Sequence, residues 1–180
     1  MPPIPAEKMT TAQKNAAEEI ISGRRGELGG PFVAALRSPE FARRLQRLGD
    51  YVRYDLALEP RLREMVILLT ARAWRQEYEW HIHAPIALES GLAPGIVSGI
   101  AENRRPADMD ADETLVYDFF GELQREKSVS DPLYTRAVDA FGEQGVIDLV
   151  GAVGYYTTLA MIMNVARTPL PDGKTPALRS

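Results

Sequence analysis

Three side chains that can transfer protons stand near the middle of the chain: Glu64, Glu79 and His83. Glu79 and His83 are four residues apart, so on a helix they share one face and their side chains are within reach of each other. Their neighbours in the sequence are mainly apolar or aromatic. An apolar environment raises the pKa of a carboxyl group, and histidine exchanges protons near neutral pH. The pair therefore predicts general acid–base catalysis.

Glu64 is distant from this pair along the chain. On one straight helix, the fifteen residues from Glu64 to Glu79 would span roughly 22 Å, too far for direct proton transfer. Either the chain turns near residues 73–76, or another subunit supplies Glu64, or Glu64 takes no part in the chemistry. Trp74-Arg75-Gln76 contains no glycine or proline to mark a turn, and the adjacent Arg63 offers Glu64 a surface ion pair instead.

The Glu/His pair also has simpler interpretations. Such a pair on an exposed helix face is commonly only solvated. Glu79 and His83 would supply two metal ligands, whereas a catalytic zinc ion usually has three from the protein. His81 lies about 200° around the helix from His83, so the two histidines cannot bind one ion. We therefore expect no metal site.

The elements that position these residues are predicted to be helices throughout. No segment shows sustained alternation of β-branched residues. Cap residues and prolines at first helical positions predict helices over about residues 11–22, 39–54, 60–69, 83–90, 94–101, 110–125, from 131 onward, and 146–167. The helix that begins at Pro60 is apolar on most sides and is expected at the centre of the fold. The fold class is thus all-α.

The length of 180 residues suits one domain with a sizeable core. We expect a partly disordered segment over residues 1–30, a single all-α domain over 31–170 with a core motif at 59–101, and a loose tail at 171–180.

Two segments resemble each other within the chain. Residues 38–49 and 131–142 place Pro, an aromatic residue, Arg and Gly at matching positions, and each precedes an apolar helix with one early acid, Glu64 or Asp148. This suggests a degenerate internal repeat, with chance similarity of two capped helices as the alternative. The second copy has no counterparts of Glu79 and His83, so only the first would be catalytic.

Composition excludes several functions. A net charge of -4 argues against nucleic acid as a partner. The absence of cysteine excludes disulfides and thiolate chemistry and fits a cytoplasmic protein.

The N-terminus lacks the pattern of a signal peptide. The apolar run at 146–165 nearly has the length of a membrane span but includes Asp148 and Asn164, so we expect a buried core or subunit-interface helix and no membrane partner.

A longer pattern resembles a known family. It consists of Arg63-Glu64-x-x-x-x-Leu69, Glu77-Tyr78-Glu79-Trp80-x-x-His83-x-x-x-Ala87, and then Gly91-Leu92 and Ile96. This pattern is similar to that of the carboxymuconolactone decarboxylase family, most densely over residues 59–101. The resemblance implies an alkylhydroperoxidase D-like bundle of helical hairpins and a homo-oligomer, a trimer or hexamer.

The resemblance also bears on the type of reaction, because the family contains peroxidase-type and decarboxylase-type members. Peroxidase-type members of the family carry Glu, then Cys-x-x-Cys, then His; these positions fall on Glu64, Gln76, Glu79 and His83. Because both cysteines are absent, a disulfide-cycling peroxidase is excluded. Decarboxylase-type members keep a Glu and a His near these positions and also lack the cysteines.

The resulting expectation is a carbon–carbon lyase of carboxymuconolactone type, acting on a small carboxylated lactone or ring. Glu64, Glu79 and His83 would be catalytic. The expected substrate-binding residues are Arg63, Arg72, Arg75, Gln76 and Trp80. No organic cofactor is expected, because no glycine-rich phosphate loop is present.

Three alternatives stay open at this point. The chain could be a non-catalytic oligomeric binding protein with a vestigial site, a hydrolase or oxidoreductase built on the same site, or a peroxidase-like relative without the redox cysteines. Burial of Glu79 and His83 distinguishes an enzyme from a binding protein, because a site open to bulk solvent would favour binding.

Overall fold

The computed structural model describes residues 1–171 and 173–178 and is built from helices. A short 3-10 helix, Ala6–Lys8, precedes α1 (Thr11–Ser22), α2 (Pro31–Ala35), α3 (Pro39–Tyr54), α4 (Pro60–Ala73), α5 (Glu77–Glu89), α6 (Pro94–Ala101), α7 (Ala111–Glu126) and α8 (Asp131–Ala166). None of the described residues forms a strand. The prediction of an all-α fold is confirmed.

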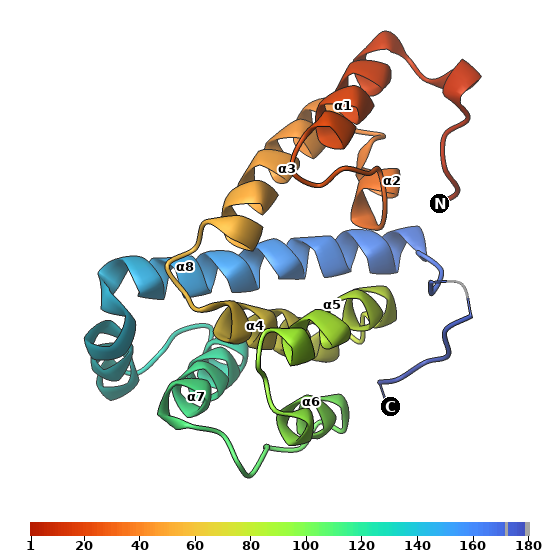
Figure 1. The fold of residues 1–180 in the computed structure, drawn as a ribbon. Helices are drawn as coiled ribbons and strands as arrows, with labels where there is room; N and C mark the ends of the chain where they lie inside the picture. The colour runs from red at the N-terminus through yellow and green to blue at the C-terminus, as the bar shows by residue number, and fades with distance from the viewer. Residues whose placement is uncertain (172, 179–180) are drawn as a thin grey trace.

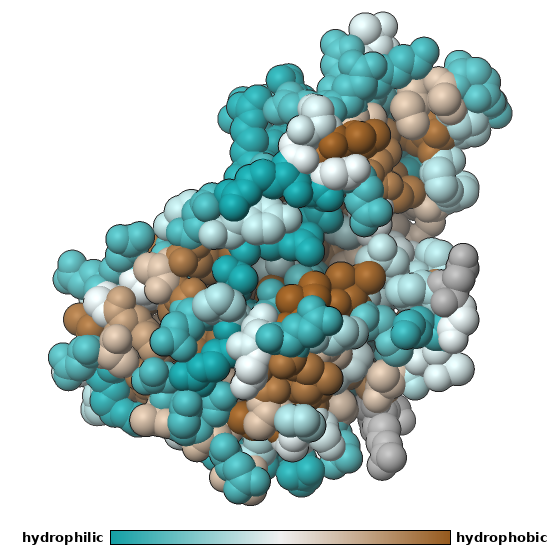
Figure 2. Space-filling model, in the orientation of Figure 1, coloured by the Kyte–Doolittle hydropathy of each residue, from teal (hydrophilic) through white to brown (hydrophobic). Residues whose placement is uncertain are grey.

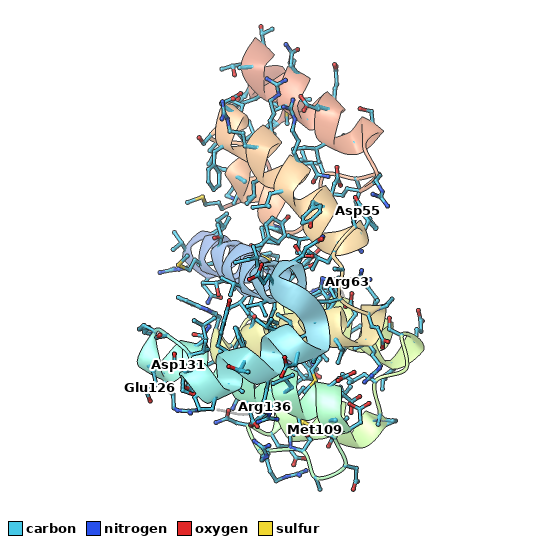
Figure 3. All side chains as sticks on the ribbon, turned by 90° about the vertical axis from the view of Figure 1, so that its left-hand side faces the viewer. Asp55, Arg63, Met109, Glu126, Asp131 and Arg136 are labelled. Carbon is cyan, nitrogen blue, oxygen red and sulfur yellow. The ribbon has the colours of Figure 1, made fainter. Side chains whose placement is uncertain are left out.

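The long helix α8 divides the molecule into two layers. Figures 1 and 3 show α1, α2 and α3 on one side of α8 and α4 to α7 on the other. Helices α2, α3, α4 and α7 all pack against α8. Residues that are far apart in the sequence therefore meet along this helix.

The helix predicted to be central is α4. Every residue from Glu64 to Ala71 is buried, and α4 packs against α5, α6, α7 and α8. Ser38 and Glu59 stand before prolines at the first position of α3 and α4, as the sequence indicated. Helices α4 and α5 form the central helical hairpin of the fold.

The N-terminal segment differs from the expected partial disorder. Helix α1 has the predicted bounds and begins with a capping box between Thr10 and Gln13. Its Ile20 is fully buried in the main core, and Glu19 pairs with Arg43 and Arg47 of α3. Helix α1 is thus packed against α3, to which it offers both an apolar face and a carboxylate.

Two further features concern the C-terminal half. The predicted helices from 131 and over 146–167 are both present, and α8 spans them across a break at Gly142, whose φ of 69° and ψ of 170° are not helical. The expected loose tail falls partly on Asp172, Arg179 and Ser180, which lie outside the described residues. Within the described part, the backbone amides of Ala177 and Leu178 donate to the Glu77 carboxylate.

Helix α8 is long and apolar enough to cross a membrane by length and composition alone, and it is the one such helix in residues 1–171 and 173–178. In its most apolar window 56% of the residues are buried inside the protein, as expected for a core helix. The outer face of α8 leaves large apolar side chains exposed, among them Ile147 and Val165. Figure 2 shows another face, mainly hydrophilic, with apolar side chains gathered over α5.

Candidate active site

A tight turn after α4 brings Glu64 to the Glu79/His83 pair. Trp74 ends α4, and Arg75 adopts the left-handed conformation with φ 50°. Gln76 then caps α5, its side-chain oxygen accepting hydrogen bonds from the amides of Tyr78 and Glu79 at 2.7 and 3.4 Å. The first of the three alternatives for Glu64, a turn within the same chain, is the one that the structure contains.

The turn is held by Asn164 of α8. Its amide nitrogen donates to the Trp74 carbonyl at 2.9 Å, and its side-chain oxygen accepts from the Gln76 amide at 2.8 Å. A residue 88 positions away from Gln76 thus satisfies a turn that has neither glycine nor proline.

Glu64 and His83 form a buried pair. Glu64 Oε2 lies 2.8 Å from His83 Nδ1, and the two residues are 2% and 5% exposed. With Glu64 ionised, Nδ1 carries the proton and donates it in this hydrogen bond, which leaves Nε2 as the proton acceptor of the ring. The ring of Tyr156 packs edge-on against His83 with centroids 5.3 Å apart and fixes the other side of the imidazole. His83 is therefore held by Glu64, not by Glu79.

Glu79 is the buried acid of the site. It is 4% exposed, and its Oε2 has no hydrogen-bond partner among the described residues. Burial away from water raises the pKa of Glu79 well above its ordinary value, and the positive charge of Arg25 opposes this shift only in part. Glu79 therefore stays protonated over a pH range in which an exposed glutamate is ionised, as a general acid requires.

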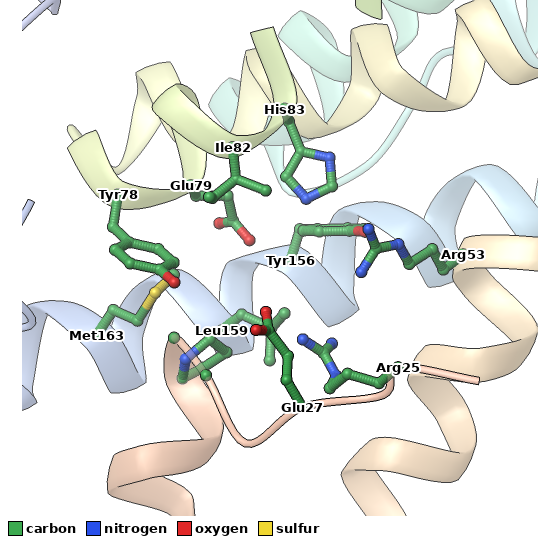
Figure 4. A pocket seen from close by; sticks show the side chains of 13 residues that line it. Arg25, Glu27, Arg53, Tyr78, Glu79, Ile82, His83, Tyr156, Leu159 and Met163 are labelled. Carbon is green, nitrogen blue, oxygen red and sulfur yellow. The ribbon is translucent and has the colours of Figure 1, made fainter. Parts of the chain in front are cut away.

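Glu79 and His83 face one cavity of about 80 Å³. Figure 4 shows α5 on one side of it, α8 behind it and the segments before α2 and in α3 on the opposite side. Its lining consists of Arg25, Glu27, Gly29, Gly30, Pro31, Arg53, Tyr78, Glu79, Ile82, His83, Tyr156, Leu159 and Met163. This volume holds a few water molecules or a small organic molecule.

The five expected substrate-binding residues lie outside this cavity. Trp80 is buried in the main core, and Gln76 is used as a helix cap. Arg63 lies beside Glu64 with its Nε 3.8 Å from Oε1, Arg72 lines a separate hollow against α6 and α7, and Arg75 is exposed in the turn. None of the five is among the residues that line the cavity with Glu79 and His83.

His81 and Asp148 have other roles. His81 points away from the cavity and its Nε2 contacts the Thr175 carbonyl at 2.8 Å. Asp148 accepts hydrogen bonds from the Tyr51 hydroxyl and the Ala57 amide, so it links α8 to α3 and to the loop that follows. In the described part of the chain, no three His, Asp or Glu side chains gather in a way that could hold a metal ion.

Sequence reasoning missed Arg25, Arg53 and Tyr156 as residues of the site. Arg25 stands among glycines ahead of the first predicted domain helix, Arg53 near the end of α3, and Tyr156 in the middle of α8. No spacing rule relates these positions to Glu79, because only the packing of the two layers on α8 brings them together.

The comparison with family models agrees with this geometry. The model of the carboxymuconolactone decarboxylase family matches residues 39–114, which contain α3 to α6 and with them Glu64, Glu79 and His83. The all-α hairpin architecture is consistent with the alkylhydroperoxidase D-like fold expected from the resemblance. No curated protein and no solved structure matches the chain.

Proposed function

We propose that this protein is an acid–base enzyme that decarboxylates a small carboxylated lactone or ring, because residues 39–114 match the model of the carboxymuconolactone decarboxylase family. The observation that carries the proposal is the buried, unpartnered Glu79 beside the Glu64–His83 pair in one cavity. Their burial favours an enzyme over a binding protein with a vestigial site.

The proposed reaction needs one proton per turnover. When the carbon–carbon bond to the substrate carboxylate breaks, CO₂ leaves and the bonding electron pair stays on the ring carbon as an enolate. Protonated Glu79 donates its proton to that carbon and becomes a carboxylate. His83, held and charge-balanced by Glu64, then returns a proton from solvent to Glu79. No cofactor takes part in this scheme.

The neutrality of Glu79 before the reaction also favours binding. An ionised Glu79 would repel the substrate carboxylate inside a cavity of low polarity, where like charges interact strongly. Burial, which raises the pKa of Glu79, therefore serves both the binding of an anionic substrate and the proton transfer.

The test is the loss of γ-carboxymuconolactone, followed by absorbance. Wild type, Glu79→Gln and His83→Ala are compared, with His81→Ala as the matched control, because His81 lies on the same helix but faces away from the cavity. We expect His81→Ala to retain turnover and the other two variants to lose about 10²- to 10⁴-fold. Absence of turnover by wild type, or normal turnover by both site variants, refutes the proposal.

Assembly and location form part of the proposal. A homo-oligomer, a trimer or hexamer, is supported by the outer face of α8, where Ile147, Val150, Met161 and Val165 are between 40% and 74% exposed. Light scattering during size-exclusion chromatography measures this directly, and a monomer at micromolar concentration contradicts it. We also propose a cytoplasmic protein whose partner is a small-molecule substrate, with neither nucleic acid nor membrane as a partner.

A further inference from the structure

The wall of the cavity that faces α5 carries two arginines. Arg25 comes from the loop between α1 and α2, and Arg53 from α3. Neither forms an ion pair with a carboxylate of the described residues, whereas other arginines do, among them Arg24, Arg43, Arg47, Arg61 and Arg105. Two guanidinium groups that share a cavity repel each other unless an anion lies between them.

Arg25 is oriented by neutral and aromatic neighbours. Its Nε donates to Gln46 Oε1 at 2.9 Å, and the Gln46 amide donates in turn to Asp50 at 2.8 Å. The guanidinium carbon lies 4.3 Å from the centre of the Phe32 ring. These contacts use Nε and one face of the group. The Tyr155 hydroxyl is a further neighbour of the guanidinium group, and the part of the group that lines the cavity is left for a ligand. Two parallel N–H groups are the geometry that binds a carboxylate in a bidentate manner.

Arg53 lies on the same side of the cavity. Figure 4 shows its guanidinium group directed from α3 toward the end of the Tyr156 side chain, with Arg25 on the adjoining wall. Arg53 lies one turn after Gly49 on α3. At Gly49 the helix lies so close to α8 that a Cβ there would collide with the Tyr155 hydroxyl. The α3–α8 contact therefore sets the position of Arg53.

The loop that carries Arg25 is held against α5. Gly30 has φ +53°, and a Cβ there would lie 2.9 Å from the Tyr78 ring. Glycine is thus needed both for the backbone conformation and for the close approach of the two segments. The loop belongs to the folded wall of the cavity even though it precedes the family-matched residues 39–114.

The charges of the lining are not balanced within the cavity. Burial raises the pKa of Glu79 and so favours its neutral form, and Glu64 is occupied by its hydrogen bond to His83. Glu27, an exposed residue at the rim, is the remaining carboxylate of the lining. Arg25 and Arg53 together carry two positive charges against this one, and the surplus favours a monoanion.

We propose that Arg25 and Arg53 form an oxyanion-binding pair that holds the carboxylate of the ligand, and that this pair selects carboxylates at the site. The inference deepens the proposed function and rests on it for the identity of the reaction, while the binding itself is testable without turnover. A carboxylate between these arginines and the opposite wall presents its attached carbon toward the unpartnered Oε2 of Glu79. The pair takes the role that sequence reasoning gave to Arg63, Arg72 and Arg75.

Imidazole NMR provides the test, because the protein contains only two histidines. In protein labelled with ¹⁵N, His83 reports on the cavity, and His81, which faces away, is an internal control. The probes are 2-furoate, its neutral isostere 2-furamide, and inorganic phosphate. We expect 2-furoate to shift the His83 signals with saturation, 2-furamide to leave them unchanged, and phosphate to bind more weakly than 2-furoate.

Variants assign the binding to the two arginines. Arg25→Gln and Arg53→Gln are each expected to weaken 2-furoate binding about tenfold or more, as for the loss of a hydrogen bond to a charged group. Arg25→Lys, which keeps the charge and loses the bidentate geometry, should fall between wild type and Arg25→Gln. Arg24→Gln is the matched control, because Arg24 is adjacent in the same loop and pairs with the exposed Asp55. Circular dichroism confirms that each variant is folded.

The outcomes separate this inference from the proposed function. If wild type shows no shift of His83 with 2-furoate, or if folded Arg25→Gln and Arg53→Gln bind it as wild type does, the oxyanion pair is refuted. Tighter binding of phosphate than of 2-furoate overturns the assignment to carboxylates. Arginine-dependent binding without turnover of γ-carboxymuconolactone refutes the decarboxylase and keeps the oxyanion pair. Turnover of γ-carboxymuconolactone that is unchanged by Arg25→Gln and by Arg53→Gln supports the decarboxylase and refutes the oxyanion pair.

Discussion

Glu79→Gln should change how the stability of this protein depends on pH. The substitution keeps the shape of the side chain and removes its titration. In the folded protein burial raises the pKa of Glu79 well above the ordinary value, whereas in the unfolded chain the carboxyl group returns to about 4.3. Between these two pKa values the folded state binds one proton more than the unfolded state.

The sign and size of the effect follow from proton linkage. Because the folded state holds the extra proton, the free energy of unfolding decreases as the pH rises from about 4.3 toward the raised pKa. One proton corresponds to a slope of up to about 1.4 kcal/mol per pH unit. The contribution is fully present below the unfolded pKa, and its loss is complete above the folded pKa. Glu79→Gln lacks this term at every pH.

Urea unfolding of wild type and Glu79→Gln at pH 5, 6 and 7 measures the difference. We expect the variant to gain stability relative to wild type at each step, by as much as about 1.4 kcal/mol per unit. Any cost of the unpartnered amide is an offset that does not depend on pH. A difference that stays constant from pH 5 to 7 would show that Glu79 is ionised in the folded protein, which refutes its role as a neutral acid.

Further predictions concern packing and charge around the site. Gly49→Ala should lower the free energy of unfolding by about 1–3 kcal/mol and weaken 2-furoate binding, because the new methyl group meets Tyr155; Gly95→Ala, where a Cβ meets open space, is the control in thermal melts. Asp148→Ala should cost about 1–3 kcal/mol by leaving its partners in α3 and the following loop unsatisfied, with kcat unchanged, and a kcat that falls with it would mean that the second half takes part in catalysis. Glu27→Gln should strengthen 2-furoate binding at low ionic strength, because it removes the rim carboxylate; equal or weaker binding would place this charge outside the field of the cavity.

The elements of this fold could largely be predicted from the sequence. The signals for these helices are local: helix caps, prolines at first helical positions and the apolar run of α4. Each depends on residues only a few positions apart, so it can be recognised in the sequence alone. Helix α2 was missed because its five residues are too few to show a period. The two helices predicted from residue 131 and over 146–167 are separated by the non-helical backbone at Gly142, in agreement with the sequence.

Part of the candidate site could be predicted from the sequence, and part of it depends on the tertiary structure. The relation of Glu79 to His83 is fixed by the geometry of one helix, and the sequence determined it. Tertiary structure decided that Glu64 reaches His83, because the turn through Arg75 has a left-handed residue that is not glycine and is held by Asn164 from α8. It also decided which cations face Glu79.

Arg63, Arg72 and Arg75 are near Glu79 in the sequence but do not line its cavity, whereas Arg25 and Arg53 reach the cavity from the other layer. Sequence alone thus predicted most of the helices, the resemblance to a family over residues 39–114 and the shared helix face of Glu79 and His83, since these depend on residue types at short spacing. The burial that raises the pKa of Glu79, its oxygen without a hydrogen-bond partner and the opposing arginines arise only when two layers pack on α8, because solvent exclusion and charge proximity are properties of the assembled chain.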